Sequence, residues 1–199
     1  MIPWFCCLLE GEKVCCFSLY GSVKYGLLTR VTDFEQLGVK LITIHARTRC
    51  QFYKGDARWK LVQLVKENVS IPVIINGDIL SATLARKALK ESTADGLMVG
   101  RAIRGRPWLL NEIAADLWSY QKYNLLNSTL LTELIINHYE EMLSFYGNDL
   151  GVKVARKHLG WYMDYVGVVS KVRRSILTEN FPKKVLYQLK TLFDYRGAA

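Results

Sequence analysis

Three short apolar runs, each ending in polar residues or glycine, are the feature that most constrains how this chain can fold. They end at His45, Asn76 and Gly100. A buried parallel strand has this appearance where its carboxyl end opens into a site. The 31 residues from His45 to Asn76 and the 24 from Asn76 to Gly100 each suffice for a strand, a helix and two loops. The sequence therefore predicts consecutive (β/α) units.

The segments around these runs complete the (β/α) pattern. Gly38 is placed to close a helix that ends at residues 33–37, and Ser81 is a suitable N-cap. The predicted strands cover residues 39–45, 72–76 and 96–99. The predicted helices cover residues 57–68, 82–91 and 108–120.

Residues 1–32 do not share this pattern. They contain the pairs Cys6-Cys7 and Cys15-Cys16, and a strand over 14–19 is the element that they favour. Thiolate metal sites need further cysteine or histidine partners at suitable spacing, which these pairs lack. The odd total of five cysteines predicts reduced thiols in a cytoplasmic protein without a metal site.

The pattern changes after residue 121. A polar loop over 121–128 precedes helical periodicity over 130–145, and further helices are predicted from about 150, from about 170 and over 183–195. No strand pattern follows residue 100. We therefore predict an α/β part at 33–121 and an all-helical part at 122–199, after an N-terminal segment at 1–32.

The chain is basic, with a formal net charge of +9 and a pI near 9.3. Residues 151–190 hold nine lysines and arginines but only two acidic residues, Asp164 and Glu179. Such a concentration of positive charge favours a polyanionic partner such as RNA. A solvated basic helix face is the alternative. The candidate RNA-binding residues are Lys153, Arg156, Lys157, Lys171, Arg173 and Arg174.

The same stretch interleaves aromatic and basic side chains. Lys153, Arg156 and Lys157 have the spacing of one helix face, and Trp161 and Tyr162 follow them. Aromatic rings among cations can stack on unpaired bases while the cations bind the RNA backbone. The apolar run at residues 2–9 is too short to cross a bilayer and has no positively charged residues before it, so we expect neither a membrane span nor a signal peptide.

Two of the strand ends carry the residues of a phosphate site. Glycines let backbone N–H groups approach an anion without a Cβ in the way, and an arginine offers a planar fork that suits phosphate oxygens. In (β/α)8 barrels a phosphate often binds at the loops after the last two strands. The predicted phosphate site consists of Asn76, Gly77, Asp78, Gly100 and Arg101.

His45 ends the first of the three strands and is a second candidate for chemistry. An imidazole there could hydrogen-bond to a flavin or nucleobase edge, or transfer a proton. A purely structural histidine is the alternative. Cys50 lies in the loop that follows, but the sequence offers no evident base for it, so we expect an inert thiol.

These motifs resemble those of one family. The segments HARTR with CQFYKG, SIPVIINGDI, ADGLMVGRAIRGRPW, and FYG followed by KVARKHLGWY are similar, in this order, to the tRNA-dihydrouridine synthases of the bacterial B-like branch. The resemblance runs from about Asp33 to Tyr195. It implies a flavin-binding (β/α)8 TIM barrel, of which the last three strands are present here, followed by a helical tRNA-binding domain.

The resemblance also implies an activity. In this family NADPH reduces FMN, which gives a hydride to C6 of a uridine flipped out of tRNA, while a cysteine protonates C5. Asn76, Gly77, Asp78, Gly100 and Arg101 would hold the phosphate and ribityl end of FMN. His45 would lie near the flavin ring or the uracil. Ala46 replaces the glycine that is usual in this motif.

The family's catalytic cysteine lies in an Asn-Gly-Cys motif, which this sequence lacks, and Cys50 is not its equivalent. Without the first five strands the barrel cannot close. We therefore expect a truncated chain that is inactive alone and that aggregates, self-associates through an open sheet edge or needs a partner fragment. The alternatives are a non-catalytic tRNA-binding remnant, or a phosphate-binding (β/α) protein for another ligand.

Overall fold

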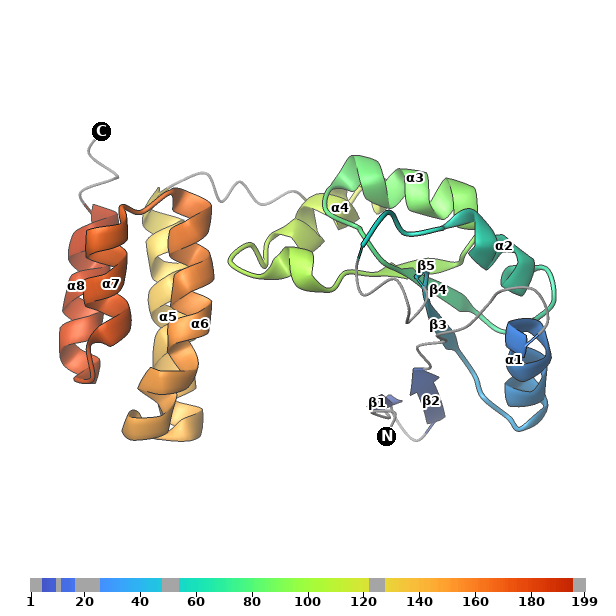
Figure 1. Cartoon of the computed structure of the whole chain (residues 1–199), viewed down its shortest axis with the longest axis horizontal. Coiled ribbons are helices and arrows are strands. Elements are labelled where there is room, and N and C mark those ends of the chain that lie inside the picture. Colours follow the sequence, from blue (N-terminus) through green and yellow to red (C-terminus); the bar gives the residue numbers. More distant parts are fainter. Residues whose placement is uncertain (1–4, 10–11, 17–25, 48–53, 122–127, 195–199) are drawn as a thin grey trace. The chain divides into compact units, whose positions relative to one another are not determined.

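The computed structural model describes residues 5–9, 12–16, 26–47, 54–121 and 128–194 (Figure 1). Its contacts divide the chain into two compact units. The first unit comprises residues 1–102 and 112–120, and the second comprises 103–111 and 121–199. Residues 103–111 thus group with the second unit, whereas the sequence predicts them in the α/β part.

A three-stranded parallel sheet forms the centre of the first unit. Its strands are β3 (Ile42–His45), β4 (Val73–Asn76) and β5 (Gly96–Met98), in the order β3-β4-β5. In the register, His45 pairs with Asn76 and Asn76 pairs with Met98. The three carboxyl ends therefore lie in one row, and the prediction of an α/β fold is confirmed. Strands β3 and β4 begin later than predicted because pairing starts only at Ile42 and Val73, and β5 ends one residue early, at Met98.

Helices α2 (Lys60–Lys66) and α3 (Ala82–Ser92) pack against each other and against the sheet (Figure 1). The core between these layers is apolar. Its buried side chains include Ile42, Val62, Val65, Ile75, Ala85 and Ala88. The predicted N-cap is confirmed, since the Ser81 hydroxyl accepts a hydrogen bond of 3.2 Å from the Leu84 N–H.

Helix α1 (Gly26–Gln36) begins well before residue 33, so the prediction that residues up to 32 lie outside the regular pattern is wrong for its last turns. Val31 is fully buried, which shows that this part of the helix contributes to the core. Gly38 has φ +86° and closes the helix as predicted. The hairpin of β1 (Phe5–Leu9) and β2 (Glu12–Cys16) precedes α1.

Two further predictions differ from the structure, one for the start of α2 and one for the position of β2. Helix α2 starts at Lys60 and not at 57, and the Ala57 and Arg58 N–H groups before it donate to Asp78 Oδ2 and to the Ala46 carbonyl. The strand predicted over 14–19 is β2, which ends at Cys16, and residues 17–19 lie outside the described chain.

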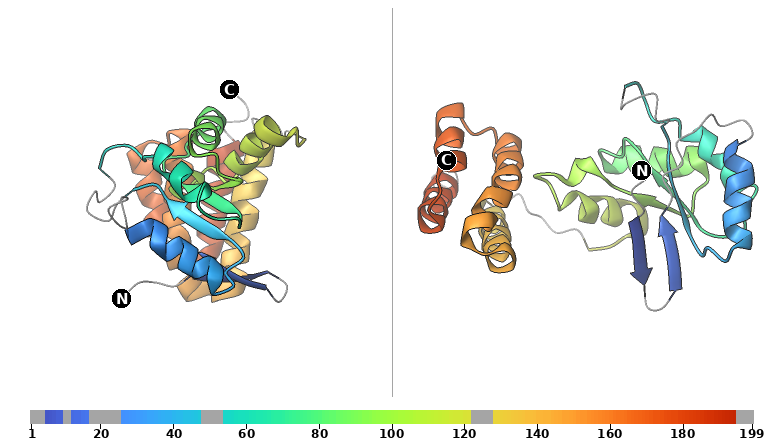
Figure 2. Two further views of the ribbon diagram at one scale, coloured as in Figure 1. Left: turned by 90° about the vertical axis from the view of Figure 1, so that its right-hand side faces the viewer. Right: turned by 60° about the horizontal axis from the view of Figure 1, so that its bottom comes forward.

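The second unit consists, in its described part after residue 121, of four helices. They are α5 (Ser128–Tyr146), α6 (Asn148–Val166), α7 (Ser170–Thr178) and α8 (Pro182–Asp194). Helix α5 packs against α6 and α8, and α7 packs against the same two helices (Figure 2). Their common core includes Ile135, Tyr139, Leu159, Met163, Ile176 and Leu189. The prediction of helices in this part of the chain is confirmed.

Helix α4 (Leu109–Trp118) and a short 3-10 turn, η2 (Arg101–Ile103), link the two units in sequence. Helix α4 is shorter at both ends than the predicted 108–120. Within the described ranges, no helix is both long and apolar enough to cross a bilayer.

Candidate functional site

Asn76 joins the carboxyl ends of the three parallel strands. Its Nδ2 donates to the Met98 carbonyl at 2.7 Å, and its Oδ1 lies 2.6 Å from Nδ1 of His45. Because Nδ2 is the donor to Met98, Oδ1 must accept, so the hydrogen of the neutral imidazole is on Nδ1. This leaves Nε2 of His45 as the acceptor nitrogen of the ring.

The second pair of side chains in the site is an ion pair between Arg47 and Asp78. Arg47 Nη2 donates to Asp78 Oδ2 at 2.5 Å and to the Gly55 carbonyl at 2.6 Å. The Arg47 side chain is only 6% exposed, against 25% for Asp78. The Ala57 N–H donates to the same Asp78 oxygen at 2.8 Å. The Asp78 carboxylate is therefore directed to Arg47 and to the chain after β3.

Gly77 lies between Asn76 and Asp78, and so between the His45–Asn76 and Arg47–Asp78 pairs, in a conformation that suits glycine. It has φ +124°, and a Cβ there would lie 3.1 Å from the Ala57 Cβ and 3.5 Å from the His45 ring. Its carbonyl accepts a hydrogen bond of 2.8 Å from Trp59 Nε1, whose side chain is buried. Asp78 also has a positive φ of 53°. The tight path of residues 77–78 is thus held by side chains from the segment before α2.

Gly100 and Arg101 follow β5 at the same edge of the sheet. A Cβ on Gly100 would lie 3.9 Å from Asn76 Nδ2, so the backbone of Gly100 stands directly beside the amide that joins the strands. Both residues are exposed. The structure therefore brings together His45, Asn76, Gly77, Gly100 and Arg101. Asp78 instead binds Arg47 and the Ala57 N–H and so holds the loop in place. Cys50 lies outside the described residues.

Sequence reasoning missed the part of Arg47 in this site. A charged residue shortly after a strand end is normally exposed, and its partner is remote in sequence. The separation from Arg47 to Asp78 is nevertheless 31 residues, the same as from His45 to Asn76. In a parallel pair, equal separations place residues opposite each other, and this would have identified the ion pair.

The six predicted RNA-binding residues of the second unit fall into two groups. Lys153, Lys157, Lys171 and Arg174 are exposed. Arg173 instead pairs with Asp164, with 2.9 Å between Nε and Oδ1, and its guanidinium lies against Gly160. Arg156 donates to Asn180 Oδ1 at 2.7 Å. Arg173 therefore ties α7 to α6 and Arg156 ties α6 to the connection between α7 and α8, and the other four cations form the exposed set.

The aromatic residues near these cations also differ from one another. Tyr162 is buried, and burial raises its pKa to about 12. Trp161 is half-buried, and the Arg104 guanidinium lies 4.9 Å from its ring centroid. Arg104, which sequence reasoning did not single out, is exposed beside Gly105, and Gly105 packs on the Trp161 backbone so closely that a Cβ has no room.

A pair of histidines lies between α5 and α6. The rings of His138 and His158 are 4.9 Å apart, and His138 Nδ1 is 3.0 Å from the Tyr162 hydroxyl. Burial lowers the pKa of His138, against the opposing effect of Glu141. Burial and the neighbouring His138 lower the pKa of His158. Both imidazoles therefore favour the neutral form.

Comparison with known proteins assigns these features to a family. The family model for dihydrouridine synthase matches residues 25–195. The chain belongs to this family. In the dihydrouridine synthase match, the first residue precedes α1 by one and the last follows α8 by one, so the match includes the parallel sheet of the first unit and the described helices of both units. The β1–β2 hairpin lies outside it.

Curated relatives agree with this assignment. A probable tRNA-dihydrouridine synthase of Rhodobacter capsulatus is 44% identical over 165 residues, which cover 83% of this chain and 50% of the relative. One of Rickettsia conorii is 42% identical over 151 residues, 76% of this chain and 46% of the relative. The tRNA-dihydrouridine synthase B of Pseudomonas syringae is 41% identical over 136 residues, 68% and 40% respectively. The chain thus spans about half the length, or less, of these curated relatives.

Proposed function

We propose that this chain provides the carboxyl-terminal part of a flavin-binding (β/α)8 barrel and the helical tRNA-binding unit of a tRNA-dihydrouridine synthase. The proposed enzyme uses FMN, with NADPH as reductant, to reduce uridine in tRNA to 5,6-dihydrouridine. The observation that carries the proposal is that one family match, 25–195, includes both the polar edge of the sheet and the basic helical unit. Because its proposed substrate is tRNA, we expect the protein to act in the cytoplasm.

The polar edge of the sheet fits the phosphate end of FMN. Gly100 is exposed beside Asn76 and Arg101 adds an exposed cation, while Gly77 is buried and lets the chain turn between Asn76 and Asp78. An anion needs such donors and positive charge without a competing carboxylate. The one carboxylate in the segment, that of Asp78, is compensated by Arg47. Asn76, Gly77, Gly100 and Arg101 would therefore hold the phosphate and ribityl end, with Asp78 shaping their loop.

When bound, FMN supplies the hydride for the reduction. The part of His45 follows from its bond to Asn76, which fixes the orientation of the ring at the carboxyl end of β3. In that state His45 can accept a hydrogen bond from an N–H group of the flavin or the uracil. The exposed cations Lys153, Lys157, Lys171 and Arg174 would bind the tRNA backbone, a contact that weakens with added salt.

The cysteine that would protonate C5 of the uridine is not among the residues of this sequence. The sequence has no Asn-Gly-Cys motif, and three strands do not close a barrel. We therefore expect that the purified chain does not form dihydrouridine by itself and that its open sheet edges favour self-association or a complementing fragment. This favours a second candidate function, a tRNA-binding protein without catalysis, which predicts tRNA binding without flavin binding.

A comparison of two flavins tests the phosphate site. FMN and riboflavin differ only in the phosphate, so the proposed site predicts that the chain binds FMN more tightly. Arg101→Ala should reduce this preference about tenfold, the effect of losing one charge-assisted contact. Arg86→Ala, which removes an exposed cation on α3, is the matched control. Equal affinity for the two flavins, or a preference that survives Arg101→Ala, would contradict the proposed site.

A further inference from the structure

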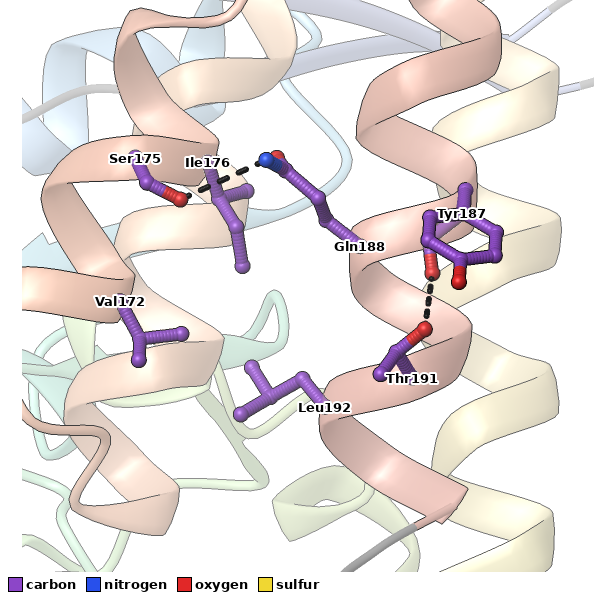
Figure 3. A pocket seen from close by; sticks show the side chains of 7 residues that line it. All are labelled: Val172, Ser175, Ile176, Tyr187, Gln188, Thr191 and Leu192. Carbon is purple, nitrogen blue, oxygen red and sulfur yellow. Dashed lines mark hydrogen bonds between the residues drawn. The ribbon is translucent and has the colours of Figure 1, made fainter.

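A groove of about 410 Å³ lies between α7 and α8 (Figure 3). Its walls are apolar and come from Val172, Ile176 and Leu192. The volume is within the range of sites for small organic groups, roughly 300 to 1,000 Å³. None of the functions discussed above uses this groove, which lies within the second unit.

One side of the groove carries an amide that is only partly satisfied. Gln188 Nε2 is 3.4 Å from the Ser175 hydroxyl, and Figure 3 shows the Gln188 side chain reaching from α8 toward α7. The Gln188 Oε1 is buried and has no hydrogen-bond partner among the described residues. A buried acceptor without a partner is unfavourable. A rotation of the Gln188 side chain would bring this oxygen to the groove surface, where an N–H donor from a ligand would satisfy it.

The rim of the groove combines an exposed aromatic ring with positive charge. Tyr187 is 72% exposed. On α8, Lys183, Lys184 and Lys190 are four residues before, three before and three after it, so all three lie beside its side chain on the helix surface. All three lysines are exposed. An aromatic ring surrounded by cations is the arrangement with which proteins hold single-stranded nucleic acid.

The acidic group nearest in sequence, Glu179, lies close enough to Lys184 to offset part of this charge. Glu179 accepts hydrogen bonds from the backbone N–H groups of Asn180 (2.8 Å) and Phe181 (2.9 Å), and these bonds lower its pKa. Helix α8 itself has no acidic residue before Asp194. The charge around the groove therefore suits a polyanion better than an apolar peptide segment.

We infer that the α7–α8 groove binds an unstacked nucleobase of an RNA chain. Tyr187 stacks on the base and Gln188 accepts a hydrogen bond from its N–H edge, while the backbone phosphates lie over Lys183, Lys184 and Lys190. This inference rests on the proposed RNA binding by the second unit. It adds a site at which that unit contacts a base and not only the phosphate backbone.

The first test measures the affinity of the full chain for an unmodified tRNA transcript over a range of salt concentrations. Tyr187→Ala should weaken binding about tenfold, the typical effect of removing one stacking ring. The slope of log affinity against log salt should stay unchanged, because no charge is lost. Tyr187→Phe keeps the ring and should bind like the unchanged chain.

Phe145→Ala is the matched control. Phe145 is an aromatic residue of α5 that is 81% exposed and lies outside the groove, with Glu141 one turn before it. Its loss should leave tRNA affinity unchanged. Lys184→Gln should lower the salt slope by about one, as expected for one phosphate contact. The two kinds of change thus separate stacking from charge.

A second variant and a second measurement distinguish loss of the base site from misfolding of the Tyr187→Ala variant. Ser175 is exposed on α7, so Ser175→Phe should fill the groove without disturbing the core, and it should weaken tRNA binding as Tyr187→Ala does. With 4-thiouridine in the transcript, photo-crosslinking should attach RNA to the peptide that contains Tyr187.

The possible failures are distinguishable. If the unchanged chain does not bind tRNA, the proposed function of the second unit is overturned and the base site with it. If the chain binds tRNA with a normal salt dependence but Tyr187→Ala and Ser175→Phe bind equally well, only the base site is overturned. That result is also expected if a protein segment, from this chain or another, fills the groove.

Discussion

The two candidate sites of this protein are built in opposite ways. At the edge of the parallel sheet, His45, Asn76, Arg47 and Asp78 are held by hydrogen bonds of 2.5 to 2.8 Å, and Arg47 is buried. In the helical unit, the cations available to a ligand are exposed and lie on separate turns. The first site is fixed before any ligand binds, and the second depends on charge density. Substitutions should therefore have large local effects in the first and small, salt-dependent effects in the second.

The largest expected effect is that of breaking the Arg47–Asp78 pair. Arg47→Met leaves the Asp78 carboxylate without its cation and should destabilise the first unit by about 3 kcal/mol. Faster hydrogen exchange of the Ala57 amide, which donates to the same carboxylate, would report the change. Arg86→Met removes an exposed pair with Asp116 and should cost less than about 1 kcal/mol. Similar losses in the two variants would show that the sheet edge is not fixed by its buried pair.

The second prediction concerns the conformation of Gly77. Gly77→Ala adds both backbone strain at φ +124° and a contact with the Ala57 Cβ, and should destabilise the first unit by about 2 kcal/mol. Gly38 has φ +86° with nothing near its Cβ position, so Gly38→Ala isolates the strain and should cost about 1 kcal/mol. Chemical denaturation of both variants measures the difference. A larger loss at Gly38 than at Gly77 would contradict the packing described here.

A pH dependence is expected for the helical unit. Because His138 and His158 have lowered pKa values, the unfolded chain binds protons at mildly acidic pH that the folded unit does not. Stability should therefore be complete near neutral pH and fall as the pH drops below about 6.5, the ordinary pKa of histidine. Thermal unfolding between about pH 7.5 and about pH 5.5 measures this, and His158→Gln should reduce the slope. Glu35 and Glu179, whose pKa values are lowered, stay ionised in that window.

The smallest effects are expected from single cations of the helical unit. Lys157→Gln should lower the salt slope of tRNA binding by about one and leave stability unchanged, since Lys157 is exposed. Arg173→Gln removes the contact with Asp164 and should instead lower stability slightly, by less than about 1 kcal/mol, with little change of slope. If both variants change the slope equally, the division of these cations into free and structural groups is wrong.

The sequence was sufficient for features that depend on local periodicity. The strand ends at His45 and Asn76, the cap at Ser81 and the four helices after residue 121 follow from apolar spacing and from the chemistry of single residues, and the third strand ends at Met98, one residue before the predicted end. Membership of the dihydrouridine synthase family, which the motifs indicated, is confirmed by the match over 25–195.

Features that depend on contacts between remote residues could not be predicted in this way. Asp78 binds the Ala57 amide in the segment before α2, and the sequence around 57 contains nothing to show this contact. Arg173 and Lys171 are both basic residues of one short helix, yet only Arg173 meets an acidic partner from α6. Burial and pairing of charged side chains are properties of the packed structure, so periodicity does not reveal them.

The most direct test of the account measures flavin retention and tRNA binding in one preparation of the full chain. After addition of FMN and desalting, we expect retained flavin absorbance that Arg101→Ala strongly lowers, together with salt-sensitive tRNA binding that Arg101→Ala leaves intact. Lys157→Gln should give the opposite pattern, with the flavin retained and a reduced salt slope. A chain that binds tRNA but retains no flavin would contradict the proposed phosphate site at the sheet edge and would favour the tRNA-binding function without catalysis.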